Sequence, residues 1–209
     1  MANSKTRGLG NRCKRGMLFV LSGPSGSGKT TLAKRILKDK RLKGILHRSV
    51  SVTTRPKRRG EIQGRDYFFV SDAEFKKQLK EKKILEWTRY LGYYYGTPKR
   101  YLDEQLKKGR NILLCLDIRG AKRIKRLYPK NSVTIFIEPP SLEVLSQRLK
   151  NRSIKTDETC IKERIALARS ELQQARLFQI RLINEDLNKV VDKLRKIILS
   201  ELNLLSVSN

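Results

Sequence analysis

The chain has 209 residues and a formal net charge of +28, because 48 lysines and arginines outnumber 20 aspartates and glutamates. Its three cysteines are widely spaced and have no histidine nearby, which argues against both a disulfide framework and a zinc site. No apolar run approaches the ~18 residues of a membrane span, and the first residues lack the long apolar segment of a signal peptide. The composition predicts one soluble, cytoplasmic domain with room for subdomain insertions.

The excess of basic residues opens an alternative, because it would attract polyanions in general. Residues 1–15 are rich in lysine and arginine, and we expect them to form a disordered basic arm. The other basic residues are spread along the chain, which is typical of a solvated surface. We expect at most incidental electrostatic binding of nucleic acid, and nucleic-acid binding as the main function stays open as an alternative.

An apolar segment at 17–21 is predicted to be a buried strand, and it leads directly into GPSGSGKTT at 23–31. This stretch matches the GxxxxGK[ST] pattern of a phosphate-binding loop, in which glycines let backbone N–H groups turn onto phosphate oxygens. Lys29 would reach the β- and γ-phosphates, Thr30 would offer its hydroxyl to Mg²⁺, and a helix predicted at 30–40 would direct its positive end at the anion. The predicted triphosphate site consists of Gly23, Pro24, Ser25, Gly26, Ser27, Gly28, Lys29, Thr30 and Thr31.

Strand-like and helix-like segments alternate along the rest of the chain. Strands are predicted at 45–52, 111–118, 133–138 and 180–184, and amphipathic helices at 71–83 and 141–151. This rhythm predicts an α/β fold with three layers around a central parallel sheet. Residues 53–98 break the rhythm with clustered arginine, glycine and tyrosine. Insertions of this kind lie over the carboxyl ends of parallel strands, so we expect a second, substrate-binding part there.

A group of aromatic residues in this region has two interpretations. The group contains Trp87, Tyr90, Tyr93, Tyr94 and Tyr95, interleaved with basic residues. Such a pattern can form a stacking platform for single-stranded nucleic acid. We instead expect most of these rings to be core or pocket wall, and we assign Tyr95, directly before Gly96, to phosphate binding.

Six segments form an ordered pattern from Met17 to Ile198. They are TTRPKRRGEIQGRDYFFV at 53–70, ILEWTRYLGYYYGT at 84–97, LDIRGA at 116–121, IFIEPPS at 135–141, RLKNR at 148–152 and INEDL at 183–187. In sequence, order and spacing they resemble the guanylate kinase family. The resemblance implies transfer of the γ-phosphoryl group of ATP to GMP, giving ADP and GDP, with Mg²⁺ as cofactor.

The resemblance also implies a division of the three-layer P-loop fold into parts. The expected core comprises residues 16–50, 99–147 and 166–209, with an inserted GMP-binding subdomain at 51–98 and a helical lid at 148–165. On the donor side, Arg148 and Arg152 lie four residues apart and share a helix face. Together with Arg164 they are expected to close over ATP, while Asn184 approaches the adenine.

On the acceptor side, the resemblance implies two groups of contacts. Guanine is expected to contact Ser51, Glu86, Thr97 and Asp117, and the GMP phosphate is expected to contact Arg55, Arg58, Tyr67 and Tyr95. A carboxylate such as Glu86 can accept from the N1–H and N2–H₂ donors of guanine together, whereas adenine presents an acceptor at N1. Catalysis is expected to rest on positioning and charge stabilisation by Lys29, Arg55, Arg148, Arg152 and Arg164.

Departures from the family pattern leave questions open. Cys115 stands where the family usually has an acidic residue, and the stretch from Arg152 to Arg164 is one residue longer than expected, so the alignment of 153–160 is open. A non-enzymatic interaction module of guanylate kinase type is the alternative function, although such modules usually lose the phosphate loop that Lys29 and Thr30 keep here. Another nucleoside monophosphate could also be the acceptor. The preference between GMP and dGMP and the oligomeric state stay open, with a monomer slightly favoured.

Overall fold

The computed structural model describes residues 15–90, 92–151 and 158–203. Its centre is a parallel sheet with strand order β2-β7-β1-β8-β9. The strands are β1 (Leu18–Ser22), β2 (Leu46–Arg48), β7 (Asn111–Cys115), β8 (Ser132–Glu138) and β9 (Ile180–Ile183). The first helix, α1 (Lys29–Ile36), begins directly after the glycine-rich loop that follows β1. The predicted strand and helix at this corner are confirmed.

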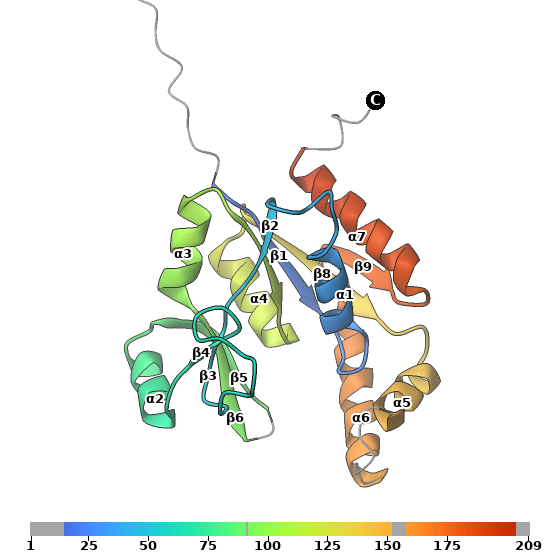
Figure 1. Cartoon of the computed structure of the whole chain (residues 1–209). Helices are drawn as coiled ribbons and strands as arrows, with labels where there is room; N and C mark the ends of the chain where they lie inside the picture. Colours follow the sequence, from blue (N-terminus) through green and yellow to red (C-terminus); the bar gives the residue numbers. More distant parts are fainter. Residues whose placement is uncertain (1–14, 91, 152–157, 204–209) are drawn as a thin grey trace, which may run out of the picture.

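Helices cover both faces of this sheet (Figure 1). Alternate residues of β1 point to opposite faces, so Phe19 and Leu21 pack in one apolar cluster with α1 and α7 (Leu187–Glu201), whereas Leu18 and Val20 pack in another. The second cluster contains residues of α3 (Lys99–Lys107) and α4 (Ile118–Leu127). The predicted three-layer α/β fold with a central parallel sheet is confirmed.

A second, smaller sheet lies beyond the carboxyl ends of the central strands, with strand order β4-β3-β6-β5. It consists of β3 (Val52–Thr53), β4 (Phe68–Phe69), β5 (Ile84–Tyr90) and β6 (Tyr93–Pro98). The helix α2 (Asp72–Lys80) begins at an N-cap, Ser71, and packs Phe75 against this sheet. The prediction of one strand over 45–52 is wrong, because β2 pairs with β7 in the central sheet while β3 pairs with β4 and β6.

Two further helices pack on each other beside the glycine-rich loop. They are α5 (Leu142–Asn151) and α6 (Glu158–Gln173), and a 3₁₀ turn at Ala175–Leu177 follows α6. Leu145 and Leu149 of α5 meet Ala168 of α6 in a small apolar cluster. Arg152 and residues 153–157, and residues 1–14 of the predicted basic arm, lie outside the described residues.

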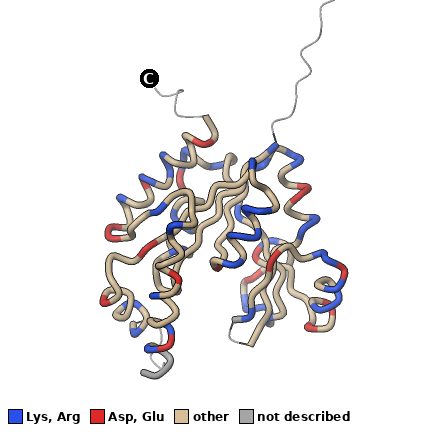
Figure 2. Tube along the Cα trace, turned by 180° about the vertical axis from the view of Figure 1, so that it is seen from behind, with Lys and Arg blue, Asp and Glu red and all other residues tan. Residues whose placement is uncertain are grey.

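Lysines and arginines are distributed over helices and loops of all parts of the molecule, as Figure 2 shows. The spread that the sequence predicted is therefore present in three dimensions. In the part of the chain that the structure describes, none of the helices combines the length and the apolar character needed to cross a bilayer.

Candidate active site

The glycine-rich loop, residues 23–28, joins β1 to α1 through glycines with positive φ angles. Gly23 and Gly28 have φ angles of 135° and 98°. A Cβ atom on Gly23 would lie 2.2 Å from the carbonyl oxygen of Ile137, and one on Gly28 would lie 2.2 Å from Nδ2 of Asn184. The loop is thus enclosed by β8 on one side and by the residue after β9 on the other.

Lys29 is the first residue of α1 and folds back over the loop. Its Nζ donates hydrogen bonds to the carbonyl oxygens of Gly23 (2.5 Å) and Pro24 (2.8 Å). A lysine ammonium on a flexible stem can exchange such carbonyl partners for phosphate oxygens at small displacement. The loop therefore holds its cation at the place where a triphosphate would bind.

Asn184 connects the loop to the helix α5. Its side chain is buried, and its Nδ2 donates to the carbonyl oxygen of Ser27 at 2.8 Å. Its own carbonyl oxygen accepts from Arg148 at 3.0 Å. The second terminal nitrogen of Arg148 is buried and has no hydrogen-bond partner among the described residues. Arg148 thus lies beside the loop, while Arg164 lies half-buried on α6.

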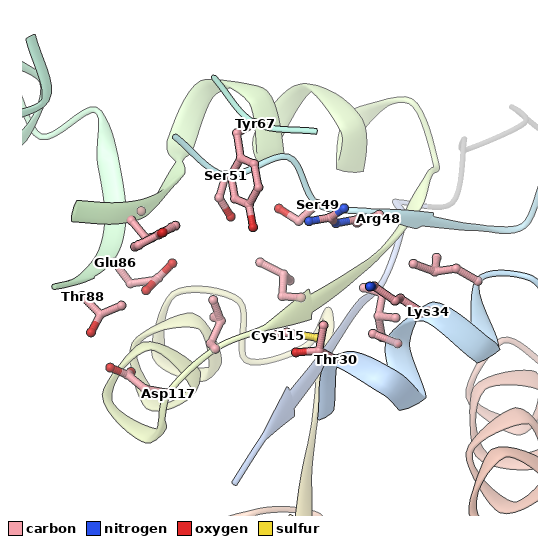
Figure 3. A pocket seen from close by; sticks show the side chains of 17 residues that line it. Thr30, Lys34, Arg48, Ser49, Ser51, Tyr67, Glu86, Thr88, Cys115 and Asp117 are labelled. Atoms are coloured by element: carbon pink, nitrogen blue, oxygen red, sulfur yellow. The ribbon is translucent and has the colours of Figure 1, made fainter. Parts of the chain in front are cut away.

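A cavity of about 310 Å³ opens between α1, the carboxyl end of β7 and the smaller sheet. Six of the predicted site residues line it, namely Thr30, Ser51, Tyr67, Glu86, Tyr95 and Asp117. In Figure 3 the hydroxyls of Ser51 and Tyr67 point into the cavity from above, Glu86 enters from one side and Thr30 closes the other. Residues that are far apart in the sequence therefore meet in one cavity.

Glu86 is a buried carboxylate of this cavity with a strongly raised pKa. It is 7 % exposed, and its carboxylate accepts a hydrogen bond of 2.5 Å from the hydroxyl of Thr97. Burial raises the pKa of Glu86 to about 7; the negative charge of Asp117 adds to this shift, and the Thr97 hydrogen bond opposes it. The side chain is therefore partly protonated near neutral pH.

The helix α4 leaves room for this carboxylate. Asp117 is its N-cap and accepts from the N–H of Gly120 at 2.7 Å. A Cβ atom on Gly120 would lie 2.8 Å from Oε2 of Glu86. Asp117 thus has a structural role besides its place on the cavity wall, and Gly120 is a site residue that sequence reasoning missed, although LDIRGA contains it.

Arg55 lies deep in the loop between β3 and β4. It is 8 % exposed, and its guanidinium lies 5.4 Å from the ring centroid of Tyr67 and 5.7 Å from that of Phe69. It forms an ion pair of 2.7 Å with Glu61, and the hydrogen bond that Arg55 donates to Glu61 raises the pKa of Arg55. Arg58 is exposed on the same loop. Arg55 thus lies beside Tyr67, which lines the cavity, and its contact with a phosphate stays a prediction.

The cavity also contains side chains that the sequence interpretation did not assign: Lys34, Arg48, Ser49, Thr88 and Cys115. Ser49 follows the carboxyl end of β2, and the rule that ligands bind at strand ends could have identified it. Cys115 reaches solvent through the cavity but lies deep in it, and this enclosure raises the pKa of the thiol to about 11. It is therefore a neutral group at the position of the missing carboxylate.

The aromatic group is divided between different environments. Tyr94 stacks on Phe75 in the core of the smaller sheet, and Tyr95 lines the cavity. Trp87 and Tyr93 are 50 % and 37 % exposed. The expectation of core or pocket wall thus holds for Tyr94 and Tyr95 and fails for Trp87 and Tyr93. Trp87 lies on β5, the edge strand of the smaller sheet, and Tyr93 is the first residue of β6.

Comparison with known proteins decides the family. A family model described as guanylate kinase matches residues 15–201. This chain belongs to the guanylate kinase family. The resemblance predicted from six sequence segments is confirmed, and membership makes the chain a nucleoside monophosphate kinase.

Individual relatives agree with this assignment. Proteins named guanylate kinase from Caldanaerobacter subterraneus and Rickettsia prowazekii are 42 % and 43 % identical to this chain. The matches cover 90 % of this chain in both cases, and 89 % and 92 % of the relatives. A crystal structure of guanylate kinase from Anaplasma phagocytophilum superposes with a TM-score of 0.69 at 31 % identity, over 90 % of this chain and 87 % of that one.

Proposed function

We propose that this protein transfers the γ-phosphoryl group of ATP to GMP or dGMP and releases ADP and GDP or dGDP. The observation that carries the proposal is the buried Glu86 carboxylate, which lines the same cavity as Thr30, the second residue of the helix that follows the phosphate-binding loop. An ionised Glu86 can accept from N1–H and N2–H₂ of guanine together. Adenine presents an acceptor at N1 and would leave the buried carboxylate without those donors, so AMP is expected to be a poor acceptor.

We propose that the donor phosphates bind over the loop at 23–28. Lys29 would leave the carbonyl oxygens of Gly23 and Pro24 and bind the β- and γ-phosphates, where its charge is most useful as the transferred group departs. Arg148 lies against Asn184 with a buried nitrogen next to the loop, which supports a contact with the triphosphate. Arg152 and Arg164 stay proposed partners in the lid.

The residues present fit a Mg²⁺ ion that arrives with ATP. Mg²⁺ keeps several waters and is bound in kinases by substrate phosphates and one or two protein oxygens. Within 15–90, 92–151 and 158–203, no group of three or more histidine, cysteine or acidic residues forms a metal cluster. Thr30 lies on the cavity wall at the start of α1 and would supply the hydroxyl ligand. The ion would supply charge neutralisation at the β- and γ-phosphates.

On the acceptor side we propose that Arg55, Arg58, Tyr67 and Tyr95 bind the GMP phosphate. Arg55 and Tyr67 are in contact, and Tyr95 lies next to them with its ring 6.1 Å from that of Tyr67. Charge-assisted hydrogen bonds from arginine and neutral ones from tyrosine hydroxyls can hold a dianion in line with the γ-phosphate. Ser51, Thr97 and Asp117 would complete the guanine site around Glu86.

We also propose the division of the chain that its sequence suggested. In this proposal the smaller sheet belongs to a GMP-binding subdomain at 51–98. The end of α5 and the start of α6 belong to a lid at 148–165, and the remaining residues from 16 onward form the core. Residues 1–15 would be a basic arm outside the catalytic unit. The expected place of action is the cytoplasm, where ATP and GMP are available.

The test is production of ADP from ATP and Mg²⁺ with GMP, dGMP, AMP, CMP, UMP and dTMP offered separately. Turnover confined to GMP and dGMP is the expected result. Turnover with AMP at the rate of GMP would refute the role of Glu86. No turnover with any acceptor would favour the non-enzymatic interaction module, against which the intact loop and Lys29 argue.

A further inference from the structure

The loop between β3 and β4 is organised around one carboxylate, Glu61. Its Oε1 accepts from a terminal nitrogen of Arg55 at 2.7 Å, and its Oε2 accepts from the backbone N–H of Arg58 at 2.8 Å. Both arginines are proposed ligands of the GMP phosphate. Their hydrogen bonds hold the pKa of Glu61 below its ordinary value, so the side chain is ionised at neutral pH.

The guanidinium of Arg55 is fixed in plane and in position by its surroundings. One terminal nitrogen is bound to Glu61, the other donates to the carbonyl oxygen of Pro56 at 2.8 Å, and the rings of Tyr67 and Phe69 lie within 6 Å. A guanidinium has five N–H donors, and the bonds to Glu61 and Pro56 use two of them. Donors therefore remain for an anion while the ion pair stays in place.

Glu61 does not neutralise the region. The guanidinium of Arg48 lies 5.6 Å from the ring centroid of Tyr67, and Arg58 and Arg59 are exposed on the loop itself. The positive charge near Arg55 therefore exceeds the single charge of Glu61, and a phosphate dianion is still attracted. An arginine side chain without a fixed partner would lose rotamer entropy when it binds the phosphate. The ion pair with Glu61 already restricts Arg55, so binding costs less of this entropy.

We infer that Glu61 is a positioning residue for the acceptor phosphate. It aligns the side chain of Arg55 and the backbone at Arg58 before the nucleotide arrives, and it stays bound to both when the nucleotide is present. This inference rests on the proposed function, since it deepens the account of the same phosphate site. It predicts that Glu61 affects the use of GMP and leaves the use of ATP unchanged.

The test compares Glu61→Gln and Glu61→Asp with the wild-type enzyme. Glutamine has one acceptor oxygen in place of two, so it can satisfy Arg55 or the Arg58 N–H but not both. We expect Glu61→Gln to raise the KM for GMP roughly tenfold to a hundredfold, as is typical for misplaced substrate-binding groups, with the KM for ATP within about twofold of wild type. Glu61→Asp keeps the charge on a shorter stem and should cause a smaller rise.

The matched control is Glu81→Gln, which removes an exposed carboxylate of the same part of the chain that pairs with Lys83 at 2.6 Å. This variant should leave both KM values unchanged. An unchanged KM for GMP in Glu61→Gln would overturn the inference. A lower KM would also overturn it, because it would show that Glu61 competes with the phosphate for Arg55. Equal losses in the Gln and Asp variants with lowered melting temperatures would overturn it in favour of a merely structural role. Turnover of the wild-type enzyme tests the proposed function, whereas the ratio of the KM for GMP in the variant to that in the wild type tests the positioning role of Glu61.

Discussion

The pKa of Glu86 makes GMP binding dependent on pH. Burial raises this pKa to about 7, and only the ionised carboxylate can accept from both guanine donors. The binding-competent fraction is then about one half at pH 7, about nine tenths at pH 8 and about one tenth at pH 6. Because the apparent dissociation constant varies inversely with this fraction, the KM for GMP should rise about tenfold from pH 8 to pH 6.

The assay is steady-state turnover at saturating ATP and Mg²⁺ from pH 6 to pH 8, with GMP varied. The phosphate of GMP itself titrates near pH 6, so Glu86→Gln serves as the control that keeps this contribution and loses the carboxylate. The ratio of the wild-type KM to the Glu86→Gln KM should therefore rise as the pH falls. A ratio that stays constant over this range, or falls in acid, would refute the reasoning.

The same shift has a consequence for stability that needs no substrate. Between pH 4.5 and about 7 the folded protein keeps a proton on Glu86 that the unfolded chain has lost, so this group lowers the free energy of unfolding as the pH rises through that window. Above pH 7 the raised pKa of Glu86 lowers the free energy of unfolding by about 3 kcal/mol in total. Glu86→Gln should therefore unfold at higher denaturant concentration than wild type at pH 8, with the difference vanishing near pH 4.

Three further substitutions test the geometry of the site. Gly120→Ala should raise the KM for GMP and leave that for ATP unchanged, since its Cβ would lie 2.8 Å from Glu86; equal effects on both would contradict this. Lys29→Ala should lower kcat about 10² to 10³-fold with an unaltered circular dichroism spectrum, and near-normal turnover would sink its role. Asn184→Ala removes the hydrogen bond to Ser27 and should lower the free energy of unfolding by about 1 kcal/mol or more while raising the KM for ATP, whereas an unchanged KM would leave the loop independent of it.

The sequence predicted the parts of the molecule that follow from local patterns. The corner at 23–31 was predictable because glycine spacing, a preceding apolar strand and a following helix all act within a few residues. The division of 45–52 between two sheets was not predictable. Ser49 and Ser51 alternate with Val50 and Val52 without a break, although the chain changes its pairing partner there. The tertiary structure determines where the strand ends and the next one begins, and the alternation of polar and apolar residues does not indicate this position.

The same limit applies to individual contacts of the site. The resemblance indicated Arg55 and Asn184, but not that Glu61 fixes Arg55 or that the amide of Asn184 supports the loop. Each of these contacts depends on the position that a side chain from a distant or irregular segment takes in the folded protein. The raised pKa of Glu86 likewise arises from its burial in the folded chain and from the nearby charge of Asp117, which no spacing in the sequence encodes.

Three charged groups of the proposed site already have partners in the structure. Lys29 is bound to loop carbonyls, Arg55 to Glu61, and Glu86 holds a proton and the Thr97 hydroxyl. An enclosed charge without a partner would cost several kcal/mol, so these arrangements stabilise the protein without substrate. They also differ in what binding must change. In the proposed complex Lys29 would exchange carbonyls for phosphate and Glu86 would give up its proton, whereas Arg55 would keep Glu61 and use its remaining donors. Of the two acceptor contacts, guanine recognition should therefore respond to pH, and phosphate recognition should respond to ionic strength.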